Sequence, residues 1–178
     1  INQTLKADKV DIEIKLGMEN HIDLGLMKDV KEAKALTLNE SEYILVEMPW
    51  EGRLPYLEEI IGDLLSYGLT PVIAHPERMK LFEVEPNLLF DFVQMGCLSQ
   101  LTASSLYGKF GNAALNNSIE IMKQGLVHII ASDTHMAKGQ RCYDMELGFT
   151  NAKRMVGIQT AARLFSTNPL SVMENQKI

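Results

Sequence analysis

Acidic and imidazole side chains stand at the ends of several apolar runs in this chain. The run "YILV" leads to Glu47, "PVIA" leads to His75, and "LVHIIAS" leads to Asp133 and, two positions on, His135. Glu19 follows an alternating apolar stretch near the start. Carboxylates and imidazoles together suit divalent cations such as Mn²⁺, Fe²⁺ or Zn²⁺, and a carboxylate can bridge two ions. Brought to one place, these side chains would form a metal site.

The first three of these residues are evenly spaced. From Glu19 to Glu47 the chain advances 28 positions, and from Glu47 to His75 it advances 28 again. One strand–helix–strand unit has about that length, roughly 30 residues. Each residue alone has an ordinary interpretation, since a single Glu at a strand end is usually solvated and a lone His usually lies at the surface. Their conjunction favours one shared site.

Strand and helix patterns alternate along the segments that must position these residues. Residues 10–18 place apolar side chains at every second position, the period of a half-buried strand. Further strands are expected at 43–49, 70–75, 97–103 and 126–133, and helices at 54–68, 86–96, 112–125, 146–157 and 158–166. The order predicts an α/β fold with a parallel sheet and helices on its outer face, either open or closed into a barrel.

The carboxyl ends of parallel strands meet at one edge of a sheet, where ligands bind in such folds. Four of the expected strands deliver a carboxylate or an imidazole to that edge, and the strand at 97–103 delivers Thr102, Ser104 and Ser105. His21 and His128 are interpreted as structural, because His21 lies past the end of the first expected strand and His128 lies within another. The edge is therefore the predicted functional site.

Composition narrows the class of protein. The chain has 178 residues and a net charge of −6, which argues against nucleic acid or an anionic membrane surface as a partner. No apolar stretch approaches the roughly 20 residues that cross a bilayer, so no membrane insertion is expected. Two cysteines, Cys97 and Cys142, are too few for a disulfide framework and favour a reducing, cytoplasmic location. We expect one domain spanning 1–178.

Other hydrolytic chemistries lack their motifs in this sequence. Neither cysteine is followed six positions later by the arginine of a cysteine phosphatase, because Ala103 and Gly148 occupy those positions. There is no Gly-x-Ser-x-Gly nucleophile motif, no phosphate-binding glycine loop with lysine, and no His-Glu-x-x-His. Both cysteines are interpreted as packing residues.

Four motifs together carry a family resemblance. The stretches "ILVEMPW", "PVIAHPER", "LSQLTASSLYGKFG" and "LVHIIASDTH", in this order, resemble the bacterial manganese-dependent protein-tyrosine phosphatases of the CpsB/CapC type. That type belongs to the polymerase and histidinol phosphatase (PHP) superfamily. The resemblance runs from about Gly17 to Arg141, and more loosely to "NPLSVM". It implies a distorted TIM-like barrel of seven βα units with a trinuclear metal site at the carboxyl rim.

The resemblance also implies a role for each candidate ligand. Glu19 would be the bridging carboxylate, and Glu47 and His75 would complete the shell of one metal ion. Asp133 and His135 would each serve a different ion. The implied cofactor is Mn²⁺ in a multinuclear site, with Fe²⁺ or Zn²⁺ as alternatives.

By the same resemblance, Arg78 and Arg141 would hold the phosphate, a task that suits planar, bidentate arginine better than lysine. Water would attack the phosphoryl group without a phosphocysteine. The implied substrate is the tyrosine-phosphorylated tail of a bacterial tyrosine autokinase that regulates capsule or exopolysaccharide assembly. A phosphoesterase acting on small phosphorylated metabolites with the same metals is the alternative.

One departure from the family pattern concerns the start of the chain. Members of the family begin with a His-x-His strand and carry further ligands that this sequence does not contain. We expect the domain to lack its N-terminal portion, either as a fragment of a complete enzyme or as a truncated relative that acts by binding. The fragment is favoured, because an open barrel would expose strand edges and core. The oligomeric state stays open.

Overall fold

A computed structural model of the chain describes residues 1–50, 52–139 and 141–178. In this part of the chain, parallel strands form one sheet in the order β1-β2-β3-β4-β5. The strands are β1 (Glu19–His21), β2 (Tyr43–Glu47), β3 (Thr70–Ala74), β4 (Leu98–Thr102) and β5 (Ile129–Ala131). Each strand pairs in parallel with the next along the chain, so all carboxyl ends lie at the same edge. The predicted α/β class with a parallel sheet is confirmed.

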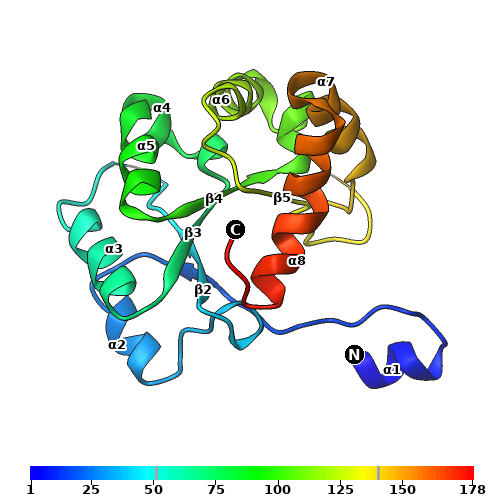
Figure 1. The fold of residues 1–178 in the computed structure, drawn as a ribbon, viewed down its shortest axis with the longest axis horizontal. Coiled ribbons are helices and arrows are strands. Elements are labelled where there is room, and N and C mark those ends of the chain that lie inside the picture. Colours follow the sequence, from blue (N-terminus) through cyan, green and yellow to red (C-terminus); the bar gives the residue numbers. More distant parts are fainter. Residues whose placement is uncertain (51, 140) are drawn as a thin grey trace.

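Helices follow the strands and form an arc along one side of the sheet (Figure 1). They are α1 (Asn2–Ala7), α2 (Leu26–Lys31), α3 (Leu57–Ser66), α4 (Lys80–Val84), α5 (Pro86–Met95), α6 (Gly111–Lys123), α7 (Glu146–Ala162) and α8 (Asn168–Met173). Short turns join them: 3₁₀ turns η1 (Leu38–Glu40), η2 (Pro76–Arg78) and η3 (Ala103–Tyr107), and a π-helical turn η4 (Arg163–Thr167). Within the described residues, no helix has the length and apolar character needed to span a bilayer.

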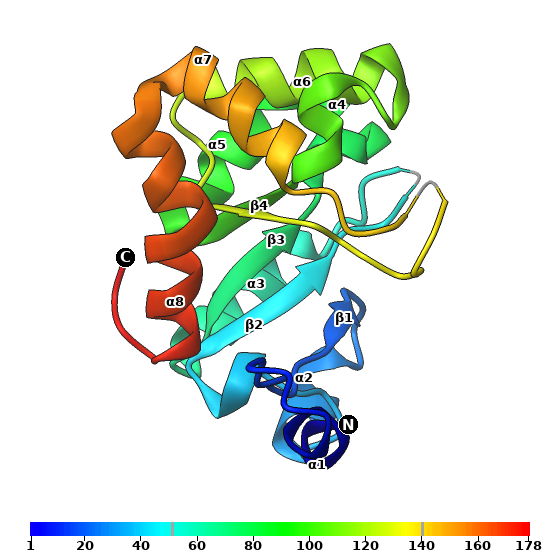
Figure 2. The same cartoon turned by 90° about the vertical axis from the view of Figure 1, so that its right-hand side faces the viewer.

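Apolar side chains cover both faces of the sheet. Ile44, Val46 and Ile73 point into the large core beneath the helices. The alternate residues of the strands form a second, smaller cluster on the other face, here called the inner face, where Val172 of α8 joins them: Tyr43, Val72, Leu98 and Ile129. Figure 2 shows α8 alongside the sheet, away from the layer of the other helices. A strand covered on both faces is what the continuous apolar run at 43–49 predicts.

Most predicted elements appear at their expected places. The strands at 43–49, 70–75 and 97–103 and the helices at 54–68, 86–96 and 112–125 each lie within a few residues of an observed element. β5 is shorter than the stretch 126–133 that predicts it. Gly157 has a left-handed φ of 81° and breaks α7 between the two expected closing helices. Glycine adopts this conformation at little cost, so the kink falls there.

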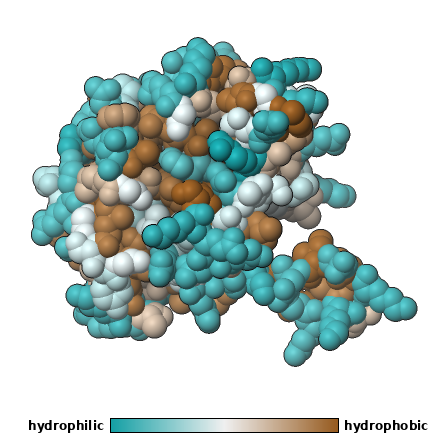
Figure 3. All heavy atoms as spheres, viewed as in Figure 1, coloured by the Kyte–Doolittle hydropathy of each residue, from teal (hydrophilic) through white to brown (hydrophobic). Residues whose placement is uncertain are grey.

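The strand predicted at 10–18 is wrong. Val10, Ile12, Ile14 and Leu16 are all exposed and pair with no strand among the described residues. The backbone N–H and C=O of Ile14 bond instead to the side-chain amide of Asn2 in α1. We call residues 1–18 the N-terminal arm. Figure 3 shows its first part standing apart from the body with hydrophobic atoms on its surface, while near its end the carbonyl of Leu16 accepts a hydrogen bond from the N–H of Asn39. An alternating pattern describes a strand only when a partner strand is available.

Candidate metal centre

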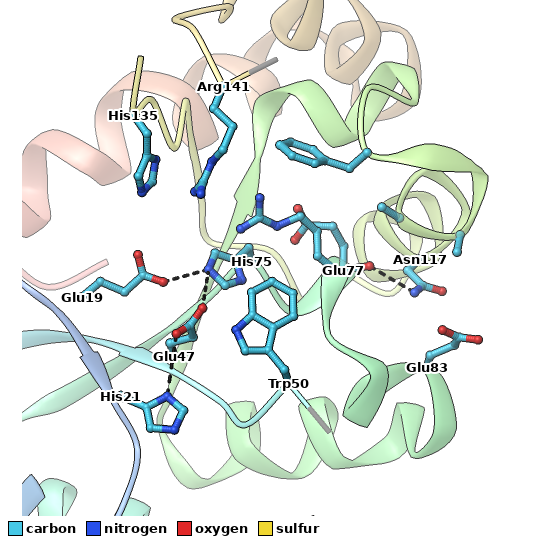
Figure 4. Close-up of a pocket in the computed structure, with 14 residues that line it drawn as sticks. Glu19, His21, Glu47, Trp50, His75, Glu77, Glu83, Asn117, His135 and Arg141 are labelled. Carbon is cyan, nitrogen blue, oxygen red and sulfur yellow. Dashed lines mark hydrogen bonds and ion pairs between the residues drawn. The ribbon is translucent and has the colours of Figure 1, made fainter. Parts of the chain in front are cut away.

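Two carboxylates and an imidazole meet at the carboxyl edge of the first three strands. Nε2 of His75 lies 2.8 Å from Oε1 of Glu19 and 3.5 Å from Oε1 of Glu47. The donor atoms of the three residues all lie within 4.8 Å of one another. Figure 4 shows Glu19, Glu47 and His75 converging from separate strands. We call these three residues the donor triad.

Register explains how β1 contributes to this triad. Glu19 pairs with Leu45 of β2, whereas His21 pairs with Glu47, so Glu19 begins β1 rather than ending it. Residues two apart in a strand share a face, which directs Glu19 and His21 to the same side. Nδ1 of His21 lies 3.7 Å from Oε2 of Glu47. The interpretation of His21 as a residue beyond the strand was therefore wrong, and its spacing from Glu19 was the signal.

His75 occupies a strained backbone conformation. Its φ and ψ are 34° and 51°, in the left-handed region that a residue with a side chain enters at a cost on the order of 1–3 kcal/mol. Its N–H still donates to the carbonyl of Gln100, which extends the pairing of β3 with β4 by one residue. Pro76 then opens the turn η2 and prevents the strand from continuing. The strain turns the imidazole toward the two carboxylates.

The chemistry of the donor triad fits a divalent cation. The hydrogen bond from His75 lowers the pKa of Glu19, outweighing the opposing effect of burial, and the charges of His75, Arg78 and His135 add to the lowering. Glu19 is thus held as an anion. Nδ1 of His75 is buried and has no hydrogen-bond partner among the described residues. Carboxylate oxygen and imidazole nitrogen donors together are those that Mn²⁺, Fe²⁺ and Zn²⁺ accept.

Asp133 lies between two arginines. Nη1 of Arg78 is 2.9 Å from Oδ2 of Asp133, and Nη2 of Arg141 donates to both carboxylate oxygens at 3.0 and 2.8 Å. The Asp133 side chain is 8% exposed and its φ is 51°. The carbonyl of Asp133 is 3.0 Å from Nδ1 of His135. The structure therefore brings Asp133 and both candidate phosphate-binding arginines into one ion-pair cluster.

The donor triad and the ion-pair cluster around Asp133 lie next to each other but remain separate groups. Asp133 and His135 lie outside the donor triad among the described residues, while Arg78 follows His75 by three positions and joins the two groups. His135, Arg78 and Arg141 line the same cavity as the triad. All seven residues singled out in the sequence therefore gather in one region.

A buried carboxyl supports the turn that carries His75 and Arg78. Glu77 is 0% exposed, and its Oε1 accepts hydrogen bonds from the N–H of Thr102 at 3.0 Å and from Oγ of Ser105 at 2.7 Å. Nδ2 of Asn117 donates to the carbonyl of Glu77 at 3.1 Å. Burial raises the pKa of Glu77 against these hydrogen bonds. Thr102 and Ser105, expected at the edge, thus act on this turn.

The cavity has a volume of about 660 Å³ and contains aromatic residues that the sequence did not reveal. The ring of Trp50 stacks on His75 with centroids 5.8 Å apart and planes at 26°. The ring of Phe110 lies 4.6 Å from the guanidinium carbon of Arg78. Both aromatic residues stand in motifs that carry the family resemblance, but no role is assigned to them there, and both reach the site from loops. Only the fold brings them together.

The structure supports the prediction of a packing role for Cys97, whereas Cys142 is only half-buried, and neither cysteine is among the residues that line the cavity. Both are free thiols, and Cys97 belongs to the large core. Burial raises the pKa of Cys97 to about 12. A thiol with such a pKa is protonated at neutral pH and is a poor nucleophile.

Comparison with known protein families finds a match that covers most of the chain. The family described as "Capsular polysaccharide synthesis, CpsB/CapC" matches residues 1–174. The match covers almost the whole chain, including the strands, the donor triad and the arginine cluster.

Similar proteins come from several bacteria. Tyrosine-protein phosphatase YwqE of Bacillus subtilis is 34% identical over 82% of this chain and 58% of its own length. Putative tyrosine-protein phosphatase CapC of Staphylococcus aureus is 37% identical over 71% of this chain and 50% of its own length. Tyrosine-protein phosphatase CpsB of Streptococcus pneumoniae is 26% identical over 100% of this chain and 75% of its own. The chain thus spans only 58% of the length of the first of these relatives and 50% of the length of the second.

A solved structure is also similar. It comes from work on YwqE from Bacillus subtilis and CpsB from Streptococcus pneumoniae, described as "unique metal-dependent tyrosine phosphatases". It superposes with a TM-score of 0.94 at 31% identity, over 99% of this chain and 71% of that chain. The strand order and helix layer described above are therefore shared with that structure.

Proposed function

The chain belongs to the CpsB/CapC family of capsular polysaccharide synthesis, and we propose that it acts as a metal-dependent protein-tyrosine phosphatase. Two findings support this: the likeness to YwqE and the donor triad at the edge of the sheet. The proposed substrate is a phosphotyrosine-bearing bacterial tyrosine kinase that regulates capsule or exopolysaccharide assembly. The proposed location is the cytoplasm.

The single observation that carries the proposal is the convergence of Glu19, Glu47 and His75 within 4.8 Å. These residues would hold a divalent cation, for which we propose Mn²⁺, with Fe²⁺ or Zn²⁺ as alternatives. Asp133 and His135 are the proposed ligands of further ions in a multinuclear site. When bound, the metal would supply Lewis-acid catalysis of phosphate ester hydrolysis by water.

The chain's own residues can bind and orient a phosphate ester. Arg78 and Arg141 present guanidinium groups at the cavity, and such groups bind phosphoryl oxygens in pairs of parallel hydrogen bonds. Asp133 forms ion pairs with both arginines in the absence of phosphate and keeps them in place. Glu77 fixes the turn between His75 and Arg78, so it holds the metal-binding and phosphate-binding side chains at a constant separation.

A finer description of the fold is also proposed. We propose that residues 1–178 belong to a single PHP-type domain, a distorted barrel of seven βα units in the complete protein. The sequential parallel order of the strands and the arc of helices on one side support a barrel wall. A structure of the complete protein in which the sheet did not close into a barrel would count against this assignment.

Metal restoration tests the proposed function. Protein treated with chelator should regain release of phosphate from a phosphotyrosine peptide when Mn²⁺ is added. Glu47→Gln and His75→Ala should each lower kcat/KM by about 100-fold or more, because each removes a donor of the triad. Glu59→Gln, on the exposed face of α3, is the matched control and should keep the wild-type rate. Full activity in His75→Ala would refute the assignment.

Substrate comparison separates phosphatase classes. The tyrosine phosphatase proposal expects the peptide to be hydrolysed with a higher kcat/KM than sugar phosphates or histidinol phosphate. A strong preference for those small molecules would instead show a metabolite phosphoesterase. A chain that binds phosphotyrosine peptide and metal but hydrolyses neither class would be a binding relative.

A further inference from the structure

The cavity has more room than the donor triad and a phosphoryl group require. Its volume of about 660 Å³ lies in the range of roughly 300–1,000 Å³ that holds whole small-molecule ligands. The metal-binding and phosphate-binding side chains occupy one part of its wall. The rest of the wall must face whatever is attached to the phosphate.

Part of that remaining wall is apolar and aromatic, while Glu83 and Asn117 also line the cavity. The apolar part is formed by Trp50 from the loop after β2, by Phe110 at the start of α6, and by Ala113 and Ala114 of α6. The two alanines are small and take up little of the cavity. An apolar surface inside an otherwise charged cavity is the kind of patch that marks a ligand-binding area.

Trp50 is exposed although it is held in place. The residue is 51% exposed, and its indole stacks on the imidazole of His75. Figure 4 shows the indole beside His75 on the side toward Glu83. The stack fixes one face of the ring, so the indole adds to the cavity wall with little freedom left to lose on binding.

Phe110 contacts a residue of the phosphate-binding side of the cavity, as Trp50 contacts a residue of the metal-binding side. Its ring lies 4.6 Å from the guanidinium carbon of Arg78, within the distance of a cation–π contact. Each aromatic ring therefore touches one residue of the polar wall, His75 or Arg78. A phosphoryl group bound between those two residues would direct its ester substituent toward the rings.

We propose that Trp50 and Phe110 form a subsite for the aromatic ring of a phosphate ester, which makes the cavity selective for aryl over alkyl phosphates. This inference rests on the proposed function, because it takes the phosphoryl group to be bound at the arginine side. Aromatic pairs contribute about 0.5–1.5 kcal/mol beyond area burial, which corresponds to a preference of about 2- to 10-fold for one ring contact. Two ring contacts would raise the preference further.

Two non-hydrolysable phosphonates test the subsite by binding alone. Benzylphosphonate carries an aromatic ring one atom from phosphorus, and n-propylphosphonate carries an alkyl chain at the same position. Their affinities for the Mn²⁺-loaded chain would be measured by isothermal titration calorimetry. Trp50 is the only tryptophan of the sequence, so its fluorescence reports ring binding directly. Benzylphosphonate should bind about 10-fold more tightly and change the emission with the same saturation curve.

Single substitutions test whether Trp50 and Phe110 produce the preference for benzylphosphonate over propylphosphonate. Trp50→Ala and Phe110→Ala should each lower the benzyl-to-propyl affinity ratio about 3- to 10-fold while propylphosphonate binding changes little. Trp50→Phe, which keeps an aromatic ring, should restore most of the ratio. Tyr67→Ala, at an exposed aromatic residue beyond α3 and outside the cavity lining, is the control and should keep the wild-type ratio.

The results of these binding experiments distinguish failure of the aryl subsite from failure of the proposed phosphatase function. Equal affinities for the two phosphonates, or an unchanged ratio in both alanine variants, would overturn the aryl subsite and leave the phosphatase proposal standing. If neither phosphonate binds, the proposed phosphate site is overturned, and the aryl subsite is overturned with it.

Discussion

Two carboxyl groups of the cavity have pKa values shifted in opposite directions. Glu19 is partly exposed and accepts a hydrogen bond from His75, so its pKa is lowered. Glu77 is fully enclosed, and burial raises its pKa even though Thr102 and Ser105 donate to it. The first arrangement suits a metal ligand that must stay ionised. The second suits a structural crosslink.

The buried carboxyl leads to a prediction about pH. A carboxyl whose pKa is raised by folding costs stability once pH exceeds its unfolded pKa, near 4.5, because ionisation is harder in the native state. Glu77→Gln cannot ionise, so its free energy of unfolding should rise relative to wild type between pH 4 and pH 8. Urea unfolding at several pH values measures this, with Glu59→Gln as control. Parallel curves for Glu77→Gln and wild type would contradict it.

The arginine cluster leads to a second prediction at this scale. Asp133→Ala removes the carboxylate that pairs with both Arg78 and Arg141, so it should lower the free energy of unfolding by about 3 kcal/mol. Glu13→Ala removes an exposed ion pair with Lys15 and should cost less than about 1 kcal/mol. Equal losses in the two variants would show that the cluster adds no stability.

At the scale of elements, α7 approaches the turn η3 closely at one glycine. A Cβ placed on Gly148 would lie 2.7 Å from the carbonyl oxygen and 2.8 Å from the Cβ of Ala103. Such a distance is too short for a carbon atom against fixed backbone, so the helix rests on the turn only because residue 148 lacks a side chain. The contact holds α7 against the segment that follows β4.

Gly148→Ala should therefore destabilise the protein by about 1–3 kcal/mol, since α7 or η3 must shift. Gly62 in α3 is a matched control because nothing lies within 4 Å of the position its Cβ would take. Gly62→Ala should stabilise the helix by about 0.5–1 kcal/mol. The two changes in melting temperature should thus have opposite signs, and equal signs would contradict the described contact.

The sequence predicts some of the strands and site residues but not others. The apolar runs at 43–49, 70–75 and 97–103 are bounded by proline, glycine or charged residues, so the sequence locates their strands. It thereby also locates Glu47 and His75, which stand at the ends of two of these strands. Residues 10–18 show the same kind of pattern but have no partner strand among the residues that the structure describes, and a pattern alone does not reveal this. Trp50 and Phe110 reach the cavity from loops, and loop positions depend on the whole fold.

At the scale of the whole molecule, the chain has a packed body and a loosely attached arm. The body contains the sheet, its two apolar clusters and the cavity. The arm contains α1, none of whose residues is buried, and the exposed stretch up to Met18. Segments with few buried contacts open most readily.

Limited proteolysis tests this division. Trypsin should cut first after Lys9 or Lys15 in the arm and leave the body intact, because both lysines lie in exposed chain with few backbone hydrogen bonds. Mass spectrometry of early digestion products identifies the sites. Early cleavage after Lys123, at the end of α6, would contradict a stable body.

The linear order of the strands also has a consequence for biosynthesis. A ribosome makes a chain from its amino end, and Glu19, Glu47 and His75 all precede the middle of this sequence. Arg78 is made with them, whereas Asp133, the acid that neutralises it, is translated more than fifty codons later. A nascent polypeptide therefore carries its metal donors and an unpaired guanidinium well before the counter-ion leaves the exit tunnel.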